Sequence, residues 1–477
     1  MRDLIEFALR VASETLGRRK DMPGNPRYQP EQLLMYLAYG TWATWLVIVE
    51  WMWLLFLAKK GIMPEEDAKH LTKENFAKVL AITTSQMDKV EDKLKHDILA
   101  LLQLMRAAMP EPLHKWLHYS LTSYDVISTA YSLQYKYTFN KAFVPMILEV
   151  DELWRQRIAE TAEYIQMGRT HIQHALPITA GFWLASAHAR FFDNVSEMAR
   201  RNGQLLGKFS GAVGSKAAGR VLISQAGDYE EEALKMMGVA QPRISTQIPP
   251  PEAITRFLFE SYMLSGSLAQ LGEDIRILQA PEFGEVLSAS SSSSTMAHKK
   301  ANPIAGENIA GMQILTFAEL CKPLLNLVSD LQRDLRNSCV MRDYSAILVY
   351  VFQQLKTAKR IFKSFKFDHE RARVNFEEDM YVVMAELMHL ALQHSGLKDS
   401  HQFVNKLLIP QAKMFGDDLA TNVELIIKNG SESPDLQLAW EGVDENIKKL
   451  MKNPEKYIGD CVKLAKKEAE RKLRLTV

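Results

Sequence analysis

The stretch from Ser290 to Asn308 reads SSSSSTMAHKKANPIAGEN. Small hydroxyl side chains demand little packing, and the His-Lys-Lys cluster beside them creates a local positive field. Asn302-Pro303 then leads into a helical pattern. These properties suit a loop that closes over an anionic substrate, although a solvated serine-rich linker has the same composition. The remainder of the chain decides between the two interpretations.

Outward from this loop the chain is predicted to be helical over most of its length. Apolar residues recur at three- and four-residue spacing, and alternating strand-like runs are scarce. Long segments of this kind favour a bundle of long helices, so the predicted fold class is all-α. The predicted helical segments are 64–84, 86–108, 142–166, 178–206, 252–280, 303–330, 343–366 and 376–396.

Breaks rich in proline and glycine divide this helical pattern into three predicted domains. In 303–330 and 343–366 the apolar positions cover more than one helix face. Such helices need several neighbours, so we expect the bundle to associate with copies of itself. The predicted domains are an N-terminal helical domain (1–117), a central long-helix bundle that carries the serine-rich loop near 288–303 (118–366), and a C-terminal helical domain (367–477).

The composition is that of an ordinary soluble globular protein. The 477 residues carry a formal net charge of +1, which gives no general affinity for nucleic acid or anionic membranes. Cys321, Cys339 and Cys461 are far apart, and no His, Cys or Asp cluster has metal-ligand spacing. Acidic residues within the N-terminal apolar pattern argue against a signal peptide. We therefore predict a cytoplasmic protein without a metal or a disulfide framework.

Residues 35–58 are apolar enough to require a test against a membrane span. They contain four tryptophans, and Glu50 is their one charged residue. The run is long enough to cross a bilayer, but a charge inside the span would be costly. Gly40, Thr41 and Thr44 also interrupt it. We predict a buried core helix instead.

Two polar segments lie before the central bundle. His96-Asp97 falls inside the helical pattern of 86–108, where the carboxylate can orient the imidazole. Thr122-Ser123-Tyr124-Asp125 reads as a helix N-cap, and helix N-termini also bind carboxylates. A surface His-Asp pair and a purely structural cap are the alternatives.

The segment 168–179, GRTHIQHALPIT, contains a proline break that precedes the long helix predicted from about residue 178. A histidine at such a break can reach into a cleft and exchange protons near neutral pH. His171 is the candidate, with Thr170 and Gln173 as polar partners, and His174 competes with it.

Two further segments combine glycine or arginine with hydroxyl residues. In Gly207–Ser215 glycines permit close backbone approach, but no strand precedes it and no Gly-Lys-Ser/Thr closes it, so we reject an ATP-binding loop. In Gln332–Arg342 the residues Arg333, Ser338 and Arg342 can converge on a phosphate or carboxylate. A flexible turn and a charged helix face are the alternatives.

Together and in this order, these segments resemble the fumarase/aspartase superfamily of lyases. The superfamily loop Gly-Ser-Ser-x-Met-Pro-x-Lys-x-Asn-Pro corresponds to 292–303, with Glu307 following. Within the superfamily the chain is most similar to the adenylosuccinate lyase family, from about residue 25 to 460. Arg27-Tyr28, Thr246-Gln247 and Gln332-Arg333-Asp334-Leu335 carry that likeness.

The resemblance implies β-elimination of fumarate from adenylosuccinate to give AMP, and from the SAICAR intermediate to give AICAR, without a cofactor. A loop serine, Ser293 or Ser294, is the implied base, aided by Lys299 or Lys300. His171 is the implied acid, and His96 lies near the phosphate or the acid. A homotetramer with sites shared between subunits is also implied. The implied substrate-binding residues are Arg27, Tyr28, Asp97, Thr122, Ser123, Thr170, Gln173, Gln247, Asn302, Glu307, Asn308, Arg333, Ser338 and Arg342.

The loop also departs from the family pattern. Its leading Gly is Ser292, its Pro is Ala297, and one residue is inserted between Met296 and Asn302; elsewhere, the Gly before Leu-Thr-Ser is Ser120. These changes keep alternatives open: argininosuccinate lyase, 3-carboxy-cis,cis-muconate cycloisomerase, or a non-catalytic homologue. Arg27, Arg333 and Arg342 argue against the other two enzymes, because arginines are the typical partners of a phosphate.

Overall fold

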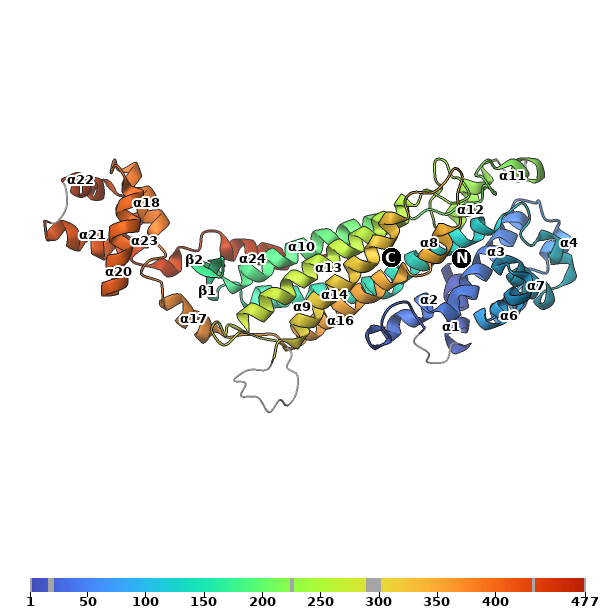
Figure 1. Ribbon diagram of the computed structural model, residues 1–477, viewed down its shortest axis with the longest axis horizontal. Coiled ribbons are helices and arrows are strands. Elements are labelled where there is room, and N and C mark those ends of the chain that lie inside the picture. The colour runs from blue at the N-terminus through green and yellow to red at the C-terminus, as the bar shows by residue number, and fades with distance from the viewer. Residues whose placement is uncertain (1, 16–20, 224–226, 289–301, 431–433, 476–477) are drawn as a thin grey trace.

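The structure is a computed structural model that describes residues 2–15, 21–223, 227–288, 302–430 and 434–475. Within these residues the chain is mostly helical, as the periodicity predicts. Figure 1 shows an elongated molecule in which long helices form a central bundle, with shorter N-terminal helices at one end and C-terminal helices at the other. Two small antiparallel sheets depart from the all-α prediction.

The apolar run near the N-terminus is a core helix, as predicted. A stretch within Glu31–Lys59 is apolar enough to cross a membrane, but 89% of it is buried inside the protein. Its long helix is α3, Trp42–Lys59. Glu50 is fully buried in α3 and holds His118, whose ring Nδ1 lies 2.6 Å from Glu50 Oε1. The neighbouring helices are α1 (Arg2–Thr15), α2 (Leu34–Leu37), α4 (Glu65–Ala68), α5 (Lys73–Leu80), α6 (Thr84–Leu94) and α7 (Asp97–Ala108).

One continuous rod spans the bundle. It consists of α8 (Ser123–Thr138), the π-helical turn η5 (Phe139–Phe143) and α9 (Val144–Glu160). At about 1.5 Å per residue the rod is roughly 55 Å long. Elements at its two ends are therefore far apart in a single chain.

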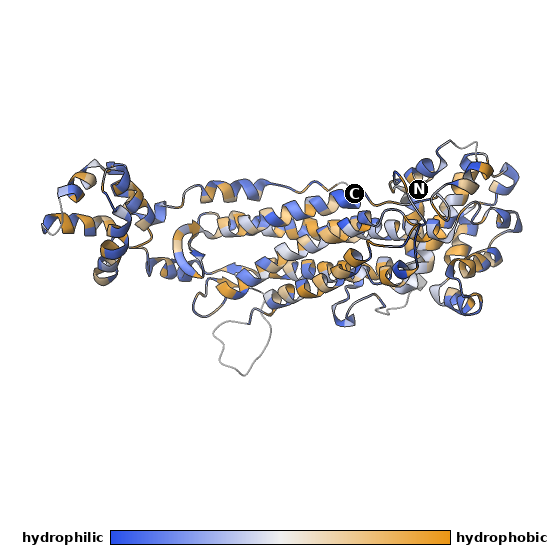
Figure 2. Cartoon of the chain, turned by 45° about the horizontal axis from the view of Figure 1, so that its top comes forward, coloured by the Kyte–Doolittle hydropathy of each residue, from blue (hydrophilic) through white to orange (hydrophobic). Residues whose placement is uncertain are grey.

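Four more long helices complete the bundle, and a glycine pair sets one of their crossings. A Cβ on Gly272 would lie 2.7 Å from the carbonyl oxygen of Gly306, and one on Gly306 would lie 2.6 Å from that of Gly272. The two backbones touch here because neither residue has a side chain. Figure 2 shows hydrophobic residues along the bundle helices. These helices are α10 (Ala180–Asn202), α13 (Glu252–Leu278), α14 (Ile304–Leu325) and α16 (Ser345–Ser364).

Four predicted helices are broken. The segment 64–84 contains two short helices, α4 and α5, and 376–396 contains the end of one helix, which stops at Glu377, and a second helix that begins at Ala385. The segment 86–108 is two helices, because Lys95 takes a left-handed conformation with φ 56° and ends α6. The segment 142–166 stops at Glu160, and its last residues enter strand β1. The strands and short helices that flank the bundle are β1 (Ile165–Thr170), β2 (Gln173–Thr179), β3 (Val286–Leu287), β4 (Lys366–Phe367), α11 (Ala217–Leu222), α12 (Tyr229–Met237) and α15 (Arg336–Met341).

The C-terminal helices have a hydrophobic core of their own, which also takes in Ile165 and Met167 from β1. The last helix, α24 (Cys461–Glu470), returns along the bundle beside α10, as Figure 1 shows. The domain limits at 117 and 366 stay predictions. The other helices of this C-terminal part are α17 (His369–Glu377), α18 (Ala385–His394), α19 (Ser400–Phe403), η7 (Val404–Leu408), α20 (Ile409–Phe415), α21 (Leu419–Lys428), α22 (Pro434–Gly442), α23 (Glu445–Met451) and η8 (Pro454–Lys456).

Candidate active site

The N-terminus of α8 is built by the predicted N-cap. Thr122 has the extended backbone of a cap residue, and its amide donates a 2.8 Å hydrogen bond to Oδ2 of Asp125. The amides of Ser123 and Tyr124 lie in the first turn, where a helix offers them no intrahelical acceptor. Together with the helix dipole, they make this end of α8 suitable for an anion.

His96 lies directly against that helix start. It is the N-cap of α7, not a residue inside a helix as predicted, and its Nδ1 accepts a hydrogen bond from the Leu99 amide at 3.4 Å. A neutral ring therefore carries its proton on Nε2. That nitrogen lies 3.4 Å from Oγ of Ser123. The structure thus brings His96 and Ser123 together.

Asp97, Ser338 and Arg342 line one pocket. Arg342 Nη2 lies 3.6 Å from Asp97 Oδ2, a loose contact that leaves the guanidinium available to another anion. The pocket has an empty volume of about 240 Å³. A second pocket of about 730 Å³ adjoins it and shares Arg342. Their common lining residues are Trp42, Tyr131 and Arg342.

Arg333 lies where three of the predicted segments meet. Its Nη1 donates to Gln247 Oε1 at 3.3 Å, and its Nη2 donates to Asn337 Oδ1 at 2.8 Å. Its guanidinium carbon lies 3.6 Å from the centroid of the Tyr124 ring. Sequence reasoning missed Tyr124 and Asn337, although both lie within the segments that it singled out. Residues from three separate parts of the chain therefore meet at Arg333.

Arg27 and Tyr28 lie in the short 3-10 turn Pro26–Tyr28. Asn25 anchors this turn, since its amide donates to the Tyr350 hydroxyl at 3.2 Å. Arg27 is exposed, and neither Arg27 nor Tyr28 lines the two pockets around Arg342. Asp21, a few residues before this turn, does line the larger pocket, so the chain passes close to it without bringing Arg27 or Tyr28 into it. In one chain the predicted Arg-Tyr pair therefore lies outside the arginine pockets.

His171 is at the tip of a β-hairpin that the sequence analysis did not predict. β1 and β2 pair antiparallel, with Thr170 opposite Gln173. The two turn residues, His171 and Ile172, have φ of 55° and 63°. Both central residues of such a turn have positive φ, which suits the twist of a hairpin but favours Asn and Gly. Thr170, His171 and Gln173 are all exposed at the tip.

His174 lies on β2 and is engaged in an internal network. Its Nδ1 lies 2.8 Å from Asp379 Oδ2, and Arg169 donates to its Nε2 at 3.4 Å. Because arginine only donates, the ring in this geometry bears its proton on Nδ1. Arg169 also pairs at 2.6 Å with the fully buried Glu285. His174 therefore orients the hairpin, and sequence reasoning missed both Arg169 and Glu285.

The start of α14 holds the last described candidates. Asn302 is partly buried just before the helix, and Glu307 is exposed in its first turn. Asn308 Oδ1 accepts a hydrogen bond from the Thr357 hydroxyl at 3.3 Å. The other loop candidates, Ser293, Ser294, Lys299 and Lys300, lie outside the described residues.

The candidates form separate groups within one chain. His96, Ser123 and Arg333 lie near the start of α8, whereas His171 follows the end of α9. The rod between them is roughly 55 Å long, and Figure 1 shows the hairpin and the α8 start at opposite ends of the bundle. A single chain therefore does not bring all the predicted residues together.

The chain is similar in sequence to a known protein family and to individual enzymes. Residues 63–315 match the family model Lyase_1, described as lyase. Relatives include an adenylosuccinate lyase of Archaeoglobus fulgidus, which is 27% identical over 90% of this chain and 92% of its own length. Another is an adenylosuccinate lyase of Pyrococcus horikoshii, 28% identical over 87% of this chain and 89% of its own.

Solved structures share the fold. A fumarate lyase from Mesorhizobium sp. BNC1 superimposes with a TM-score of 0.76 at 22% identity, covering 96% of this chain and all of the other. A 3-carboxy-cis,cis-muconate lactonizing enzyme from Pseudomonas putida gives a TM-score of 0.74 at 19% identity, covering 93% and 97% of the two chains. These likenesses concern the fold alone.

Proposed function

The chain belongs to the lyase family that residues 63–315 match, the fumarase/aspartase superfamily, and from this premise we propose that it is an adenylosuccinate lyase. It would eliminate fumarate from adenylosuccinate to give AMP, and from SAICAR to give AICAR. Both substrates are succinylated on nitrogen, carry a phosphate and contain a planar heterocycle. The site must therefore hold a phosphate at one end and two carboxylates at the other.

One observation carries this proposal: two arginines lie among aromatic rings beside an anion-accepting helix start. Arg333 is held flat on Tyr124 and bonded to Gln247. Arg342 lines pockets that also contain Trp42 and Tyr131. Guanidinium groups suit phosphate, and aromatic rings suit a planar base. The relatives that are 27% and 28% identical are adenylosuccinate lyases, which supports the same substrate.

The succinyl group would lie at the start of α8. Ser123, the first-turn amides and Asn302 would support the charge that spreads onto a carboxylate when the neighbouring carbon loses its proton. A loop serine, Ser293 by counting from Lys299 or Ser294 from Lys300, would remove that proton. A nearby lysine must lower the serine pKa for this step.

His171 would protonate the departing nitrogen. Its exposure at a hairpin tip leaves the ring free to enter a cleft of another chain, and an imidazole exchanges protons near neutral pH. The hairpin is tied to the body of the protein through Arg169 and Glu285. This anchoring gives His171 a defined position.

We further propose a homotetramer with shared sites, because the groups lie at opposite ends of the bundle. Exposed apolar side chains on α14 support association: Ile314 is 67% exposed, Phe317 52% and Leu325 81%. Burying such residues between subunits is favourable. The compartment proposed for this enzyme is the cytoplasm.

Incubating the purified protein with adenylosuccinate and following fumarate release tests the reaction. Turnover of adenylosuccinate but not of argininosuccinate is expected. Release of fumarate from argininosuccinate instead would replace the proposal with the related lyase. No turnover of any succinylated substrate would favour a non-catalytic homologue.

Mixing two inactive variants tests the shared site. His171→Ala and Arg342→Ala change groups at opposite ends of the bundle. If sites are shared, dissociating and reassembling a mixture should restore part of the activity, because some sites receive both intact residues. Mixtures as inactive as the separate variants would place each site within one chain.

A further inference from the structure

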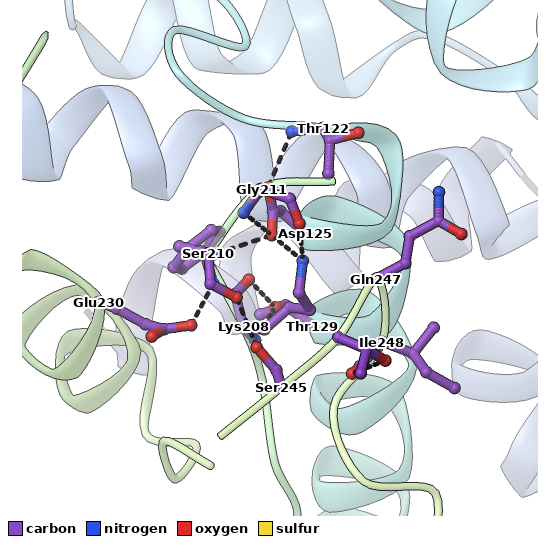
Figure 3. A network of polar contacts seen from close by, with 12 residues as sticks. Thr122, Asp125, Thr129, Lys208, Ser210, Gly211, Glu230, Ser245, Gln247 and Ile248 are labelled. Carbon is purple, nitrogen blue, oxygen red and sulfur yellow. Dashed lines mark hydrogen bonds and ion pairs between the residues drawn. The ribbon is translucent and has the colours of Figure 1, made fainter. Parts of the chain in front are cut away.

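A buried ion pair beneath the start of α8 links three segments of the candidate site. Asp125 is in the first turn of α8, and Lys208 lies 83 residues further along the chain. Both side chains are completely buried, with 0% exposure each, and they form a direct salt bridge. Figure 3 shows the surrounding contacts, which we call the Asp125 network: Thr122, Asp125, Lys208, Ser210, Gly211 and Ser245.

The Asp125 carboxylate accepts from backbone groups on two different segments. It takes the Thr122 amide at 2.8 Å and the Ser210 amide at 3.0 Å, and the Gly211 amide lies 3.2 Å from both its oxygens. Lys208 Nζ donates to the same carboxylate and to the Gly211 carbonyl at 2.7 Å. One carboxylate therefore fixes the glycine-rich segment against the helix start.

The network continues toward Arg333. The hydroxyls of Ser210 and Ser245 lie 2.6 Å apart. A Cβ on Gly214, whose φ is +80°, would come within 2.0 Å of the Ser245 carbonyl oxygen, so the two backbones are in contact. Two residues after Ser245, Gln247 accepts from Arg333. The Asp125 network thus reaches from the α8 start to the segment that contacts Arg333.

Energetics argue that the pair has a role beyond holding the core together. Burial raises the pKa of Asp125, and Lys208 with the backbone amides opposes that rise. Buried ion pairs seldom stabilise a fold more than apolar residues of similar volume. What an apolar pair cannot do is accept three backbone amides and so fix the position of a helix end.

We propose that Asp125 and Lys208 are positioning residues that set the start of α8 for a dicarboxylate. They keep the Thr122 amide occupied and direct the Ser123 and Tyr124 amides, with the Ser123 hydroxyl, toward the ligand. This inference rests on the proposed function, since it assigns the α8 start to the succinyl group.

Two variants and one control separate positioning from stability. Lys208→Met leaves a buried carboxylate without its cation and should destabilise the fold. The double variant Asp125→Asn with Lys208→Met removes both charges and should recover much of that stability. The matched control is Asp151→Asn, which breaks another buried ionic contact, to Arg155 and His188, within the bundle.

Urea unfolding and calorimetric fumarate binding are the measurements, made on the full chain alongside adenylosuccinate turnover. The double variant should recover stability but bind fumarate roughly tenfold more weakly, about the worth of one charge-assisted contact. Asp151→Asn should lose stability and keep its fumarate affinity. Recovery of stability together with full fumarate affinity in the double variant would overturn the positioning role.

Failure of the proposed function gives a different result. If the unaltered protein binds fumarate in a manner that depends on Asp125 but releases none from adenylosuccinate, the substrate assignment falls and the positioning role stands. If the unaltered protein turns over adenylosuccinate and the double variant binds fumarate with the same affinity as the unaltered protein, the substrate assignment stands and the positioning role falls. Absence of fumarate binding by the unaltered protein overturns the positioning role.

Discussion

The guanidinium of Arg333 lies over the face of the Tyr124 ring, 3.6 Å from its centroid. This contact connects the segment after α14 to the first turn of α8. It holds the arginine plane in one orientation, which a flexible side chain alone would not do. Arginine and tyrosine therefore act as one preformed unit at the proposed phosphate end.

Arg333→Lys should raise KM for adenylosuccinate more than it lowers kcat. Lysine keeps the charge but cannot stack on Tyr124 and bond Gln247 and Asn337 together. We expect kcat/KM to fall roughly 10- to 100-fold, the range of one or two charge-assisted hydrogen bonds. The control is Arg336→Lys, an exposed arginine that pairs with Asp334. Equal losses in the two variants would contradict a substrate role for Arg333.

His171→Ala should lose turnover far more than His174→Ala. A general acid contributes roughly 10²- to 10⁴-fold to rate, whereas His174 is bonded to Arg169 and Asp379. His174→Ala should instead lower the thermal midpoint, because a buried part of the hairpin network loses a partner. Steady-state kinetics and thermal unfolding of both variants test this, and equal kinetic losses would refute the assignment.

For the loop serines, Ser293→Ala should abolish turnover while Ser294→Ala spares more of it. The ranking follows if Lys299 corresponds to the family lysine, as the count along the loop suggests. Initial rates of fumarate release provide the measurement. If Ser294→Ala loses more turnover than Ser293→Ala, the serine must be counted from Lys300, and Lys300 is then the loop lysine.

Ser120→Gly should stabilise the protein by about 1 kcal/mol. Ser120 has φ of 62°, a left-handed conformation that glycine adopts without strain. Its hydroxyl oxygen is also buried without a hydrogen-bond partner among the described residues. Urea unfolding measures the change. Ser196→Gly, inside α10, should instead cost roughly 0.5 kcal/mol, and a loss in both variants would show that Ser120 is not strained.

Stability should decrease as pH rises through the folded-state pKa of His188. This ring is fully buried, with Nδ1 2.8 Å from Glu468 and Nε2 3.0 Å from Asp151. Burial opposes its charge, but the two carboxylates prevail and raise its pKa above 6.5. The charged ring therefore stabilises the fold fully below pH 6.5, and this contribution is lost above the raised value.

Urea unfolding between pH 6 and 9 provides the test for His188. At its steepest, one proton contributes about 1.4 kcal/mol per pH unit. His188→Gln should remove only part of the pH dependence of unfolding. Burial lowers the pKa of His118, but its contact with Glu50 prevails and raises that pKa, so His118 contributes a second pH-dependent step. An unchanged slope would show that His188 does not titrate with folding.

Local patterns predicted the parts of this structure that local physics decides. The long apolar periodicity of α13, α14 and α16 specified helices to within a few residues. Thr122 was predictable as an N-cap because the cap and its Asp125 partner are three residues apart. The sequence also singled out the segments that contain Gln247 and Arg333. In the structure these two side chains are hydrogen-bonded to each other.

Other features depend on partners distant in sequence. The hairpin at His171 carries no Asn-Gly turn signal, since Thr-His-Ile-Gln supplies its four central residues. Its geometry is held by Arg169 and Glu285, which are 116 residues apart. The break at Lys95 likewise follows from a left-handed residue that ordinary helix periodicity does not reveal. Sequence alone could not indicate either one.

The rod formed by α8, η5 and α9 has a consequence for how activity returns after denaturation. It keeps the hairpin and the α8 start roughly 55 Å apart in each chain. Helices can reform within one chain at a rate independent of protein concentration. If the sites are shared as proposed, recovered catalysis must follow encounter between chains. The half-time for regaining turnover would then lengthen on dilution, while the half-time for regaining helicity stays constant.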